Sequence, residues 1–484
     1  MIQKIYTTFI SFAFAALTLS SCSDWLDLYP SDEIKEEYLF SSGDGFRTAT
    51  NGIYRKMATF DLYGSNLTWG ILDAWAQAYY IEQAPSIAGG TPMRKIAELA
   101  FKNTELVPVT DAMWKAAWNV VANCNELAQQ AVQADPNLFY GLDSERQMIL
   151  GEAIGLRAFV QFDLLRIYAP SPSSVGFRED NRTFIPYVNV YPSYINDHQT
   201  VNYCLEQIIA DLKEAQRILE EVDKESKMNA NSRFNINEVS QSQFAGSRGY
   251  RLNYYAVTAM LARVYCWAGE YGNAYKEAKE VVDATYSTGS TSTASCFNFS
   301  NSLTTNRKDY NSIIMTFFKS TCYEDYLPYM TKGNDVVLVV NTTNLFGDEA
   351  GADDRNLDLF GDWDGGDIKY SFKYDIKEGT SGTDMIPAIR LSEMYYIMGE
   401  YFAYKDEFSK AGEMLDKVRY ARGISTTNLA SSIGSLEVFH THLIKEMRRE
   451  FVGEGQMFFQ YKRLDQKPKD NVVFVFDKPN NEDI

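Results

Sequence analysis

Two segments far apart in the chain share one pattern, which limits the folds open to this sequence more than any other feature. Arg251 to Ala284 and Arg390 to Arg422 each show the periodicity of two short helices joined by a turn. In both, small residues recur where paired helices would cross, and large residues recur where one pair would meet the next. Because such a pair buries its apolar face only against a neighbour, the pattern predicts an array of helix pairs.

The spacing is that of the tetratricopeptide repeat, a motif of about 34 residues. In the first copy the motif positions are occupied by Leu261, Ala262, Tyr265, Gly269, Tyr271, Ala274 and Ala278. In the second copy they are occupied by Met398, Gly399, Phe402, Phe408, Ala411 and Leu415.

Helical periodicity extends over most of the chain, so we predict a mostly α-helical protein. Val201 to Val222 is the clearest single case, with apolar residues recurring every three or four positions. The repeat helices are expected at roughly 111–168, 201–222, 251–284, 390–422 and 436–459, which would form about four helix pairs.

Long insertions interrupt the predicted array, roughly at 66–108, 170–198, 223–250 and 286–385. They are too long to be simple turns, and long loops on a rigid scaffold commonly carry binding residues. Residue content predicts short strands at Val336 to Val340 and at Ile368 to Tyr374. The expected fold class is a tetratricopeptide-like helical scaffold with loop-rich insertions and a few short strands.

The N-terminus has the pattern of an export signal. Lys4 precedes an uncharged run from Ile5 to Leu19, and the sequence Leu19-Ser20-Ser21-Cys22 ends it. The run is shorter than the roughly 20 residues of a transmembrane helix. We therefore expect residues 1–21 to be removed, Cys22 to be lipidated, and residues 22–484 to form a single domain tethered by its lipid. The alternative is an ordinary secretory signal.

The charge and the cysteines exclude some classes of protein. With 46 Lys and Arg against 64 Asp and Glu, the net charge is −18, which disfavours general nucleic-acid binding. Five cysteines follow Cys22. The sequence contains no CxxC motif, the usual sign of a zinc or redox site. Cys124, Cys204 and Cys266 lie in helical patterns and are expected as free, buried thiols, whereas Cys296 and Cys322 could pair or stay free.

The sequence lacks the motifs of the common catalytic and metal sites: GxSxG, the P-loop, HExxH and the dinucleotide fingerprint. His440 and His442 are two residues apart, so on a helix they point in different directions and cannot bind one metal together. Aspartates crowd the segment 348–367 and could bind calcium, but the segment lacks the EF-hand ligand pattern. We expect a solvated acidic loop, no metal site and no cofactor.

Several charged residues lie inside apolar helical patterns, where an unpaired charge is costly. They are Arg157, Arg263, Arg390, Glu393 and Glu400. Each is expected to have a partner, as are Glu446, Arg448, Arg449 and Glu450 on the last predicted helix. Arg390 and Glu393, three residues apart, are expected to meet on one helix face.

Aromatic residues make up 14% of the chain, and many fall in the insertions. Flat rings on a surface can stack on the apolar faces of sugars or hold peptide side chains. On this ground the candidate ligand-binding residues are Trp75 first, then Trp69 and Trp363, then Tyr323 and Tyr326. The alternative for each ring is that it packs its loop onto the scaffold.

An ordered set of sequence blocks resembles the SusD/RagB family of surface lipoproteins of Bacteroidetes nutrient-uptake systems. The blocks run from the lipidation motif at Cys22 through Leu26-Asp27, Leu156-Arg157-Ala158, Asp354-Arg355, Lys373-Tyr374, Pro387 to Tyr395, Leu415 to Arg419, Arg448 to Phe451 and Gly453-Glu454-Gly455, to Phe476 and Ile484.

The resemblance implies a non-catalytic lipoprotein of the outer membrane that faces the cell exterior. Such a protein would capture oligosaccharides, or in some cases peptides, and act as the lid of a SusC-like TonB-dependent barrel. The resemblance assigns no ligand class and no ligand-contacting residue here. Two other hypotheses remain: a helical surface hydrolase with two carboxylates about 5 to 10 Å apart across a cleft, and a scaffold that binds only proteins.

Overall fold

The computed structural model describes residues 36–80, 92–98, 104–171, 179–223, 228, 233–234, 244, 246–331, 337–363, 365–376, 382–470 and 472–479. Cys22 and the predicted signal segment lie outside these residues.

Helices form most of the described structure. They are α2 (Glu36–Leu39), α3 (Gly43–Met57), α4 (Ile71–Trp75), α5 (Pro92–Ala97), α6 (Val107–Gln133), α7 (Leu142–Tyr168), α8 (Val201–Asp223), α9 (Tyr254–Trp267), α10 (Tyr271–Val282), α11 (Cys322–Tyr326), α12 (Thr342–Phe346), α13 (Asp354–Asp358), α14 (Leu391–Ala403), α15 (Phe408–Ala421), α16 (Leu436–Glu450) and α17 (Gln456–Leu464). Among the described residues, none of these helices is both long and apolar enough to cross a membrane.

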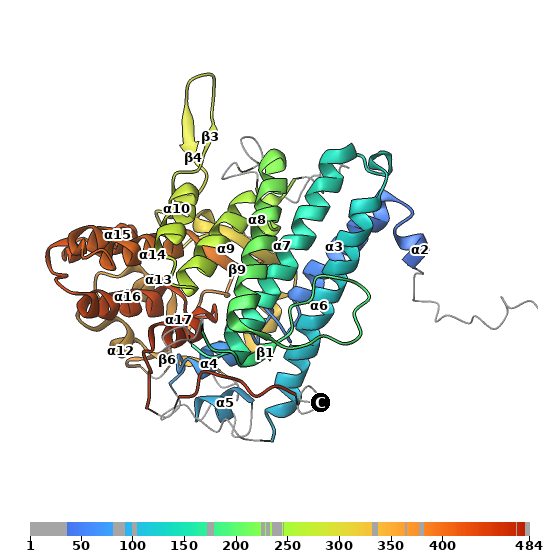
Figure 1. Cartoon of the computed structure of the whole chain (residues 1–484). Coiled ribbons are helices and arrows are strands. Elements are labelled where there is room, and N and C mark those ends of the chain that lie inside the picture. The colour runs from blue at the N-terminus through green and yellow to red at the C-terminus, as the bar shows by residue number, and fades with distance from the viewer. Residues whose placement is uncertain are drawn as a thin grey trace, which may run out of the picture.

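The long helices form the predicted array. From α6 to α10 each helix packs against the next, and α10 then packs against α14, although the 286–385 insertion separates these two in sequence. From there α14 packs on α15, and α15 on α16 (Figure 1). The mostly α-helical, tetratricopeptide-like fold class is confirmed.

Small residues hold the repeat helices close together, as the pattern predicts. Ala274 and Ala278 on α10 are fully buried in the pair that α10 forms with α9. At Gly399 on α14, an added Cβ would lie 3.2 Å from the Phe439 ring and 3.4 Å from the Ala411 carbonyl oxygen. A larger residue there would push these helices apart.

The segment 436–459 forms two helices instead of the single one expected. Helix α16 ends at Glu450 and α17 begins at Gln456. Gly453 and Gly455 between them have φ of +81° and +69°, a conformation that glycine adopts without strain and that ends a helix. The periodicity continues across this turn, which explains the wrong prediction.

The strands are short and belong to four small sheets, with β1 (Thr183–Ile185) on β2 (Gln199–Thr200), β3 (Thr285–Ser287) on β4 (Thr293–Ser295), β5 (Ile313–Phe318) on β9 (Met385–Arg390), and the order β6 (Val339–Asn341), β8 (Ile368–Ser371), β7 (Phe360–Asp362). All pairings are antiparallel. Strands β6 and β8 confirm the two predicted strands. The β3–β4 hairpin projects from the helical body (Figure 1).

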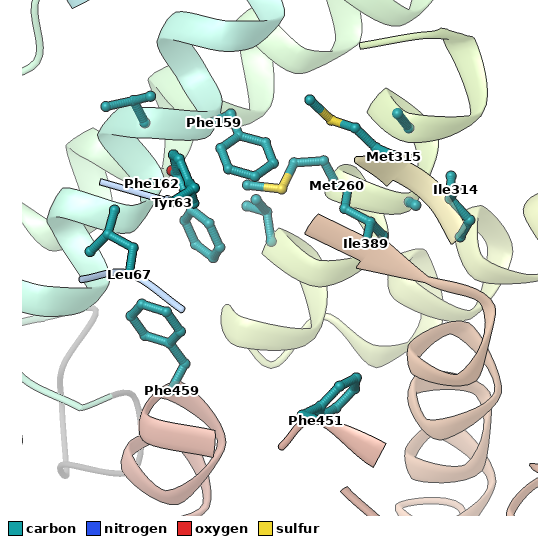
Figure 2. Packing of buried hydrophobic residues seen from close by; sticks show 14 of the residues in the cluster. Tyr63, Leu67, Phe159, Phe162, Met260, Ile314, Met315, Ile389, Phe451 and Phe459 are labelled. Atoms are coloured by element: carbon teal, nitrogen blue, oxygen red, sulfur yellow. The ribbon is translucent and has the colours of Figure 1, made fainter. Parts of the chain in front are cut away.

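One cluster of buried apolar side chains extends along the chain from Phe46 to Phe476. Helices α7 and α9 and the strands β5 and β9 contribute to it, and Figure 2 shows Phe159, Met260 and Ile389 in the same interior region. Strand β5 is buried from Ile313 to Phe317. Phe318, its last residue, is 42% exposed.

The charged residues inside the helices have partners, though not always the expected ones. Arg263 binds Glu393 through two hydrogen bonds of 2.6 and 2.7 Å, and Arg390 lies 2.6 Å from Glu454. The predicted Arg390–Glu393 pair is therefore wrong. Arg390 is the last residue of β9, outside helix α14, so the i,i+3 geometry does not apply to it. Arg157 pairs with Asp211, and Glu400 with Arg463.

A larger set of charges is buried where α13, α15 and α16 meet, and we call it the C-terminal charge network. Its members are Asp309, Glu349, Asp353, Arg355, Asp416, Arg419, Arg422, Glu446, Arg449 and Glu450. The expected partners of Glu446, Arg449 and Glu450 are confirmed. Arg448 has no ion pair with a described residue and borders a separate pocket beside Asn344.

The acidic segment 348–367 is only in part the solvated loop we expected. Asp348, Asp362 and Asp367 are exposed, whereas Asp353 is fully buried, where it binds Arg355 and caps α13. The five cysteines after Cys22 are all free and buried, so Cys296 and Cys322 do not pair.

Candidate ligand-binding cleft

Three of the five predicted ligand-binding aromatics are core residues. Trp75 is 4% exposed, lies parallel to Phe476 with ring centroids 3.6 Å apart, and donates its indole N–H to the Val473 carbonyl. Trp69 and Tyr326, each 3% exposed, meet edge to face at 5.4 Å. These rings have no free face for a ligand, so the prediction is wrong for Trp75, Trp69 and Tyr326. They pack their segments onto the scaffold.

The other two predicted aromatics are half-buried. Trp363, which follows β7, packs against the small cluster of Val337, Val339 and Ile368. Tyr323 on α11 packs against the main core. The structure does not bring Trp363 and Tyr323 into the cleft described below, and their role in binding stays a prediction.

A cleft of about 870 Å³ opens between α3, the 244–251 segment and the end of β5. Helix α3 provides one wall through Arg47, Asn51, Tyr54, Arg55 and Ala58. The spacing of three and four between these residues places them on one helix face. The helix is positioned by its buried side chains, such as Phe46 and Ile53, and by its packing on α6.

The floor of the cleft is fixed by a buried hydrogen-bond network around Glu152 of α7. This carboxylate accepts 2.7 Å from the Tyr54 hydroxyl and 2.8 Å from Arg251, and it also pairs with Arg248. Burial alone would raise the pKa of Glu152, but Arg251 and Arg248 outweigh it and lower this pKa. A carboxylate that is held ionised keeps both guanidinium groups and the Tyr54 phenol in place.

Aromatic rings give the cleft its apolar surface. Phe318 is 42% exposed and meets Tyr250 edge to face at 5.5 Å. Tyr250 is held by the hydrogen bond of 2.8 Å that its hydroxyl donates to Asp384. Across the cleft, the Phe244 ring lies 3.8 Å from the Arg251 guanidinium and 5.6 Å from that of Arg47. The exposed face of Phe318 is the surface on which a flat apolar ligand face can stack.

Polar side chains at the rim complete the lining. Asn51, Ser320 and Thr321 are exposed, and Thr59 is half-buried. Amide and hydroxyl groups donate and accept hydrogen bonds, as a sugar ring with its many hydroxyls requires. An aromatic face, guanidinium groups and short polar side chains therefore surround one open space.

A second cleft of about 770 Å³ lies at the other end of a row of aromatic rings. Tyr250 meets Phe234 at 5.4 Å, and Phe234 meets Tyr310 at 6.4 Å. Tyr310 lines the second cleft with Phe299, Asn298, Ser300, Asn301, Ser302, Thr305, Asn306 and Asn311. These lining residues carry amide and hydroxyl groups and no formal charge.

The described residues include no group of three or more His, Cys, Asp or Glu side chains placed to hold a metal ion. His440 and His442 on α16 are half-buried. Burial is the main cause that lowers the pKa of both imidazoles.

The sequence reasoning missed Phe318, Tyr250 and Phe244. One signal was available: Phe317 and Phe318 end an apolar run, and neighbouring residues of a strand point to opposite faces. With Phe317 in the core, Phe318 must turn outward. The cleft as a whole gave no signal, because its walls come from segments that only the fold brings together.

Fold and clefts define a helical-repeat scaffold whose inserted segments form ligand-sized hollows. Residues 262–475 match the model of the SusD family. A search of the curated proteins found no match.

Solved structures with the same fold come from Bacteroides, and several of them are of SusD superfamily proteins. A SusD superfamily protein from Bacteroides thetaiotaomicron is 21% identical with a TM-score of 0.64, over 87% of this chain and 88% of that one. A SusD-like carbohydrate binding protein from Bacteroides vulgatus is 19% identical with a TM-score of 0.62, over 88% and 84%. A putative sugar binding protein from Bacteroides vulgatus is 20% identical with a TM-score of 0.64, over 90% and 91%.

At these identities the structures show a shared fold. The family match over residues 262–475 and the shared fold support the resemblance to the SusD/RagB family that the ordered sequence blocks indicate.

Proposed function

We propose that this protein is a non-catalytic, lipid-anchored protein of the outer-membrane surface that binds oligosaccharides in the 870 Å³ cleft and delivers them to a TonB-dependent barrel, acting as its lid. The single observation that carries the binding proposal is Phe318, a large ring left 42% exposed at the end of a buried strand and in the lining of the 870 Å³ cleft. No cofactor is needed for this function.

The comparisons support a saccharide as the ligand. Two proteins of the same fold are described as a carbohydrate binding protein and a putative sugar binding protein. The lining agrees with this, because a sugar presents an apolar ring face for Phe318 and hydroxyls for Asn51, Ser320 and Thr321.

The anchor and the partner belong to the same proposal. The pattern that ends at Cys22 supports lipidation, and the family supports a SusC-like barrel as the partner. An open cleft binds a ligand more weakly than an enclosed pocket. A barrel that covers the cleft would contact the rest of the ligand, so the complex would bind the ligand more tightly than the free protein does.

The test is calorimetry of residues 23–484 against plant, host-mucin, starch and fungal oligosaccharides, compared with Phe318→Ala. We expect one glycan class to bind and the variant to lose about five-fold or more in affinity, since one aromatic stacking contact contributes about 1 kcal/mol or more. Tyr203→Ala on α8 is the matched control, because Tyr203 is 43% exposed and lies outside the cleft.

Three results would contradict the proposal. Equal losses of affinity in Phe318→Ala and Tyr203→Ala would show that the glycan does not bind in the cleft. Binding of peptides in place of glycans would indicate a peptide-capturing lipoprotein of the same type. Capture of protein partners by a chain that ignores both ligand classes would indicate a protein-binding scaffold.

A further inference from the structure

The cleft that contains Phe318 differs in charge from the rest of the protein. The whole chain carries a net charge of −18. The cleft lining nevertheless includes four cationic side chains, Arg47, Arg55, Arg251 and Lys319, and no Asp or Glu. Cationic groups that line a concave surface attract anions at short range, even when the distant surface is negative.

Two of these cations are held by carboxylates next to the cleft wall. Arg47 binds Glu145 at 2.6 Å and Asp44 at 2.9 Å, and the Glu145 hydrogen bond is the main cause that raises its pKa. Arg251 binds Glu152 at 2.8 Å. These two guanidinium groups are held in position by their partners, and both lie against the Phe244 ring.

Lys319 lies at the rim. Its ammonium group is 2.8 Å from Asp325, whose side chain is 38% exposed. The Lys319 side chain is 18% exposed, so the ion pair is partly open to solvent, and a ligand anion can compete with Asp325 for Lys319.

Arg55 is the remaining cation. It is exposed on the cleft face of α3, four residues after Asn51, and forms no ion pair with any described residue. A guanidinium group binds a carboxylate through two parallel hydrogen bonds, a geometry that selects planar anions. Arg55 is therefore free to bind a ligand carboxylate at the same cleft where Phe318 offers an apolar face.

The neutral second cleft makes the contrast clear. Its lining has amides, hydroxyls and two aromatic rings, which suits an uncharged sugar. Only the first cleft combines an exposed ring with cations, so the two clefts are not equivalent binding surfaces.

We propose that the ligand of the first cleft is an acidic saccharide, one with carboxylates on its sugar units, with its ring face on Phe318 and a carboxylate on Arg55. This inference rests on the proposed saccharide binding and specifies its ligand class. Lys319 is the second cation available to the same or a neighbouring acidic unit.

The experiment compares each acidic ligand with a counterpart that lacks the carboxylate charge. Calorimetry of residues 23–484 is done with oligogalacturonate and its methyl ester, and with sialylated glycans and the same glycans after removal of sialic acid. We expect one acidic ligand to bind about ten-fold or more tightly than its neutral counterpart, and to bind less tightly as salt is raised.

Two variants on α3 locate the charge effect. Arg55→Gln is expected to reduce affinity for the acidic ligand about ten-fold, and to reduce affinity for the neutral counterpart much less. Lys56→Gln removes a neighbouring cation that does not line the cleft, and it is expected to change neither affinity. Arg55 is a surface residue, so both variants are expected to fold.

The outcomes separate this inference from the proposed function. Neutral glycans that bind as well as acidic ones, with loss only in Phe318→Ala, would keep the saccharide cleft and overturn the acidic specificity. Equal effects of Arg55→Gln and Lys56→Gln would also overturn it. Binding of poly-glutamate with no acidic glycan bound would assign the cleft to acidic peptides, and the failure of all glycans would overturn the proposed function itself.

Discussion

The carboxylate of Asp73 on α4 connects this helix to the turn around Gly453 and Gly455, far away in the sequence. It is fully buried, and its two oxygens accept hydrogen bonds from the backbone N–H groups of Gly453 (2.7 Å) and Gly455 (2.9 Å). Burial is the largest influence and raises its pKa to about 7, although these two N–H groups and Lys373 oppose that shift.

This raised pKa predicts a pH dependence of stability. Between about pH 4 and pH 7 the folded protein holds a proton on Asp73 that the unfolded chain has lost, so the free energy of unfolding falls as pH rises, by up to about 1.4 kcal/mol for each pH unit. Urea unfolding from pH 4 to 8 measures it. Asp73→Asn is expected to flatten the slope. Parallel curves for the two proteins would contradict the assignment.

Glu450 illustrates how strongly the C-terminal charge network depends on each member. Its carboxylate accepts from Arg355 (3.1 Å) and Arg422 (2.5 Å) at a site with almost no solvent access. Burial disfavours the charge, but Arg422 and Arg355 outweigh burial and hold the pKa of Glu450 far below its usual value.

Glu450→Gln keeps the shape and removes the charge, which leaves two buried guanidinium groups undercompensated. We expect a loss of about 3 to 5 kcal/mol in the free energy of unfolding. Guanidinium chloride titration at neutral pH measures this loss. Glu437→Gln, at an exposed position of the same helix, is expected to change it by less than about 0.5 kcal/mol. Similar small losses in both variants would show that the network contributes little.

At the scale of elements, the turn between α16 and α17 sets the direction of the chain after the repeat array. Gly455 has φ +69°, and a Cβ added there would lie 2.3 Å from the Leu67 carbonyl oxygen. The turn thus packs directly on the segment before α4, and Asp73 of α4 accepts hydrogen bonds from the same turn.

Gly455→Ala is expected to destabilise the protein by about 2 kcal/mol or more, because it combines a left-handed backbone with a steric clash. Gly434→Ala is the control, since Gly434 has open space around its Cβ position and no positive φ. Thermal unfolding followed by circular dichroism compares the two. A loss in Gly434→Ala equal to that in Gly455→Ala would contradict the steric argument.

At the scale of the whole molecule, periodicity predicted the helices well because packing against one neighbour leaves a regular apolar stripe, as in Val201–Asp223. Periodicity could not distinguish an aromatic side chain that binds a ligand from one that packs in the core. Trp75 and Phe318 both lie in irregular or short elements, yet one is stacked on Phe476 and the other is exposed. That difference arises from contacts between segments hundreds of residues apart, as with Trp75 and Val473.

The main apolar cluster also predicts how the molecule unfolds. Cys124, Cys204 and Cys266 lie on α6, α8 and α9, and the remaining thiols, Cys296 and Cys322, lie in the 286–385 insertion. All five are buried, and burial raises the pKa of Cys124 and Cys204 to about 12 and that of Cys296 to about 11, so almost no thiolate is present at neutral pH.

Residues 23–484 are therefore expected to react negligibly with a thiol reagent such as dithionitrobenzoate in the folded state and to release five equivalents after unfolding. Because one apolar cluster connects Phe46 to Phe476, the five thiols should become reactive over the same range of urea concentration. Release of three equivalents would reveal a disulfide. Early reaction of Cys296 and Cys322 alone would show that the insertion opens independently of the helical array. Because Phe318 and Lys319 belong to this insertion, the cleft could then change shape while the scaffold stays folded.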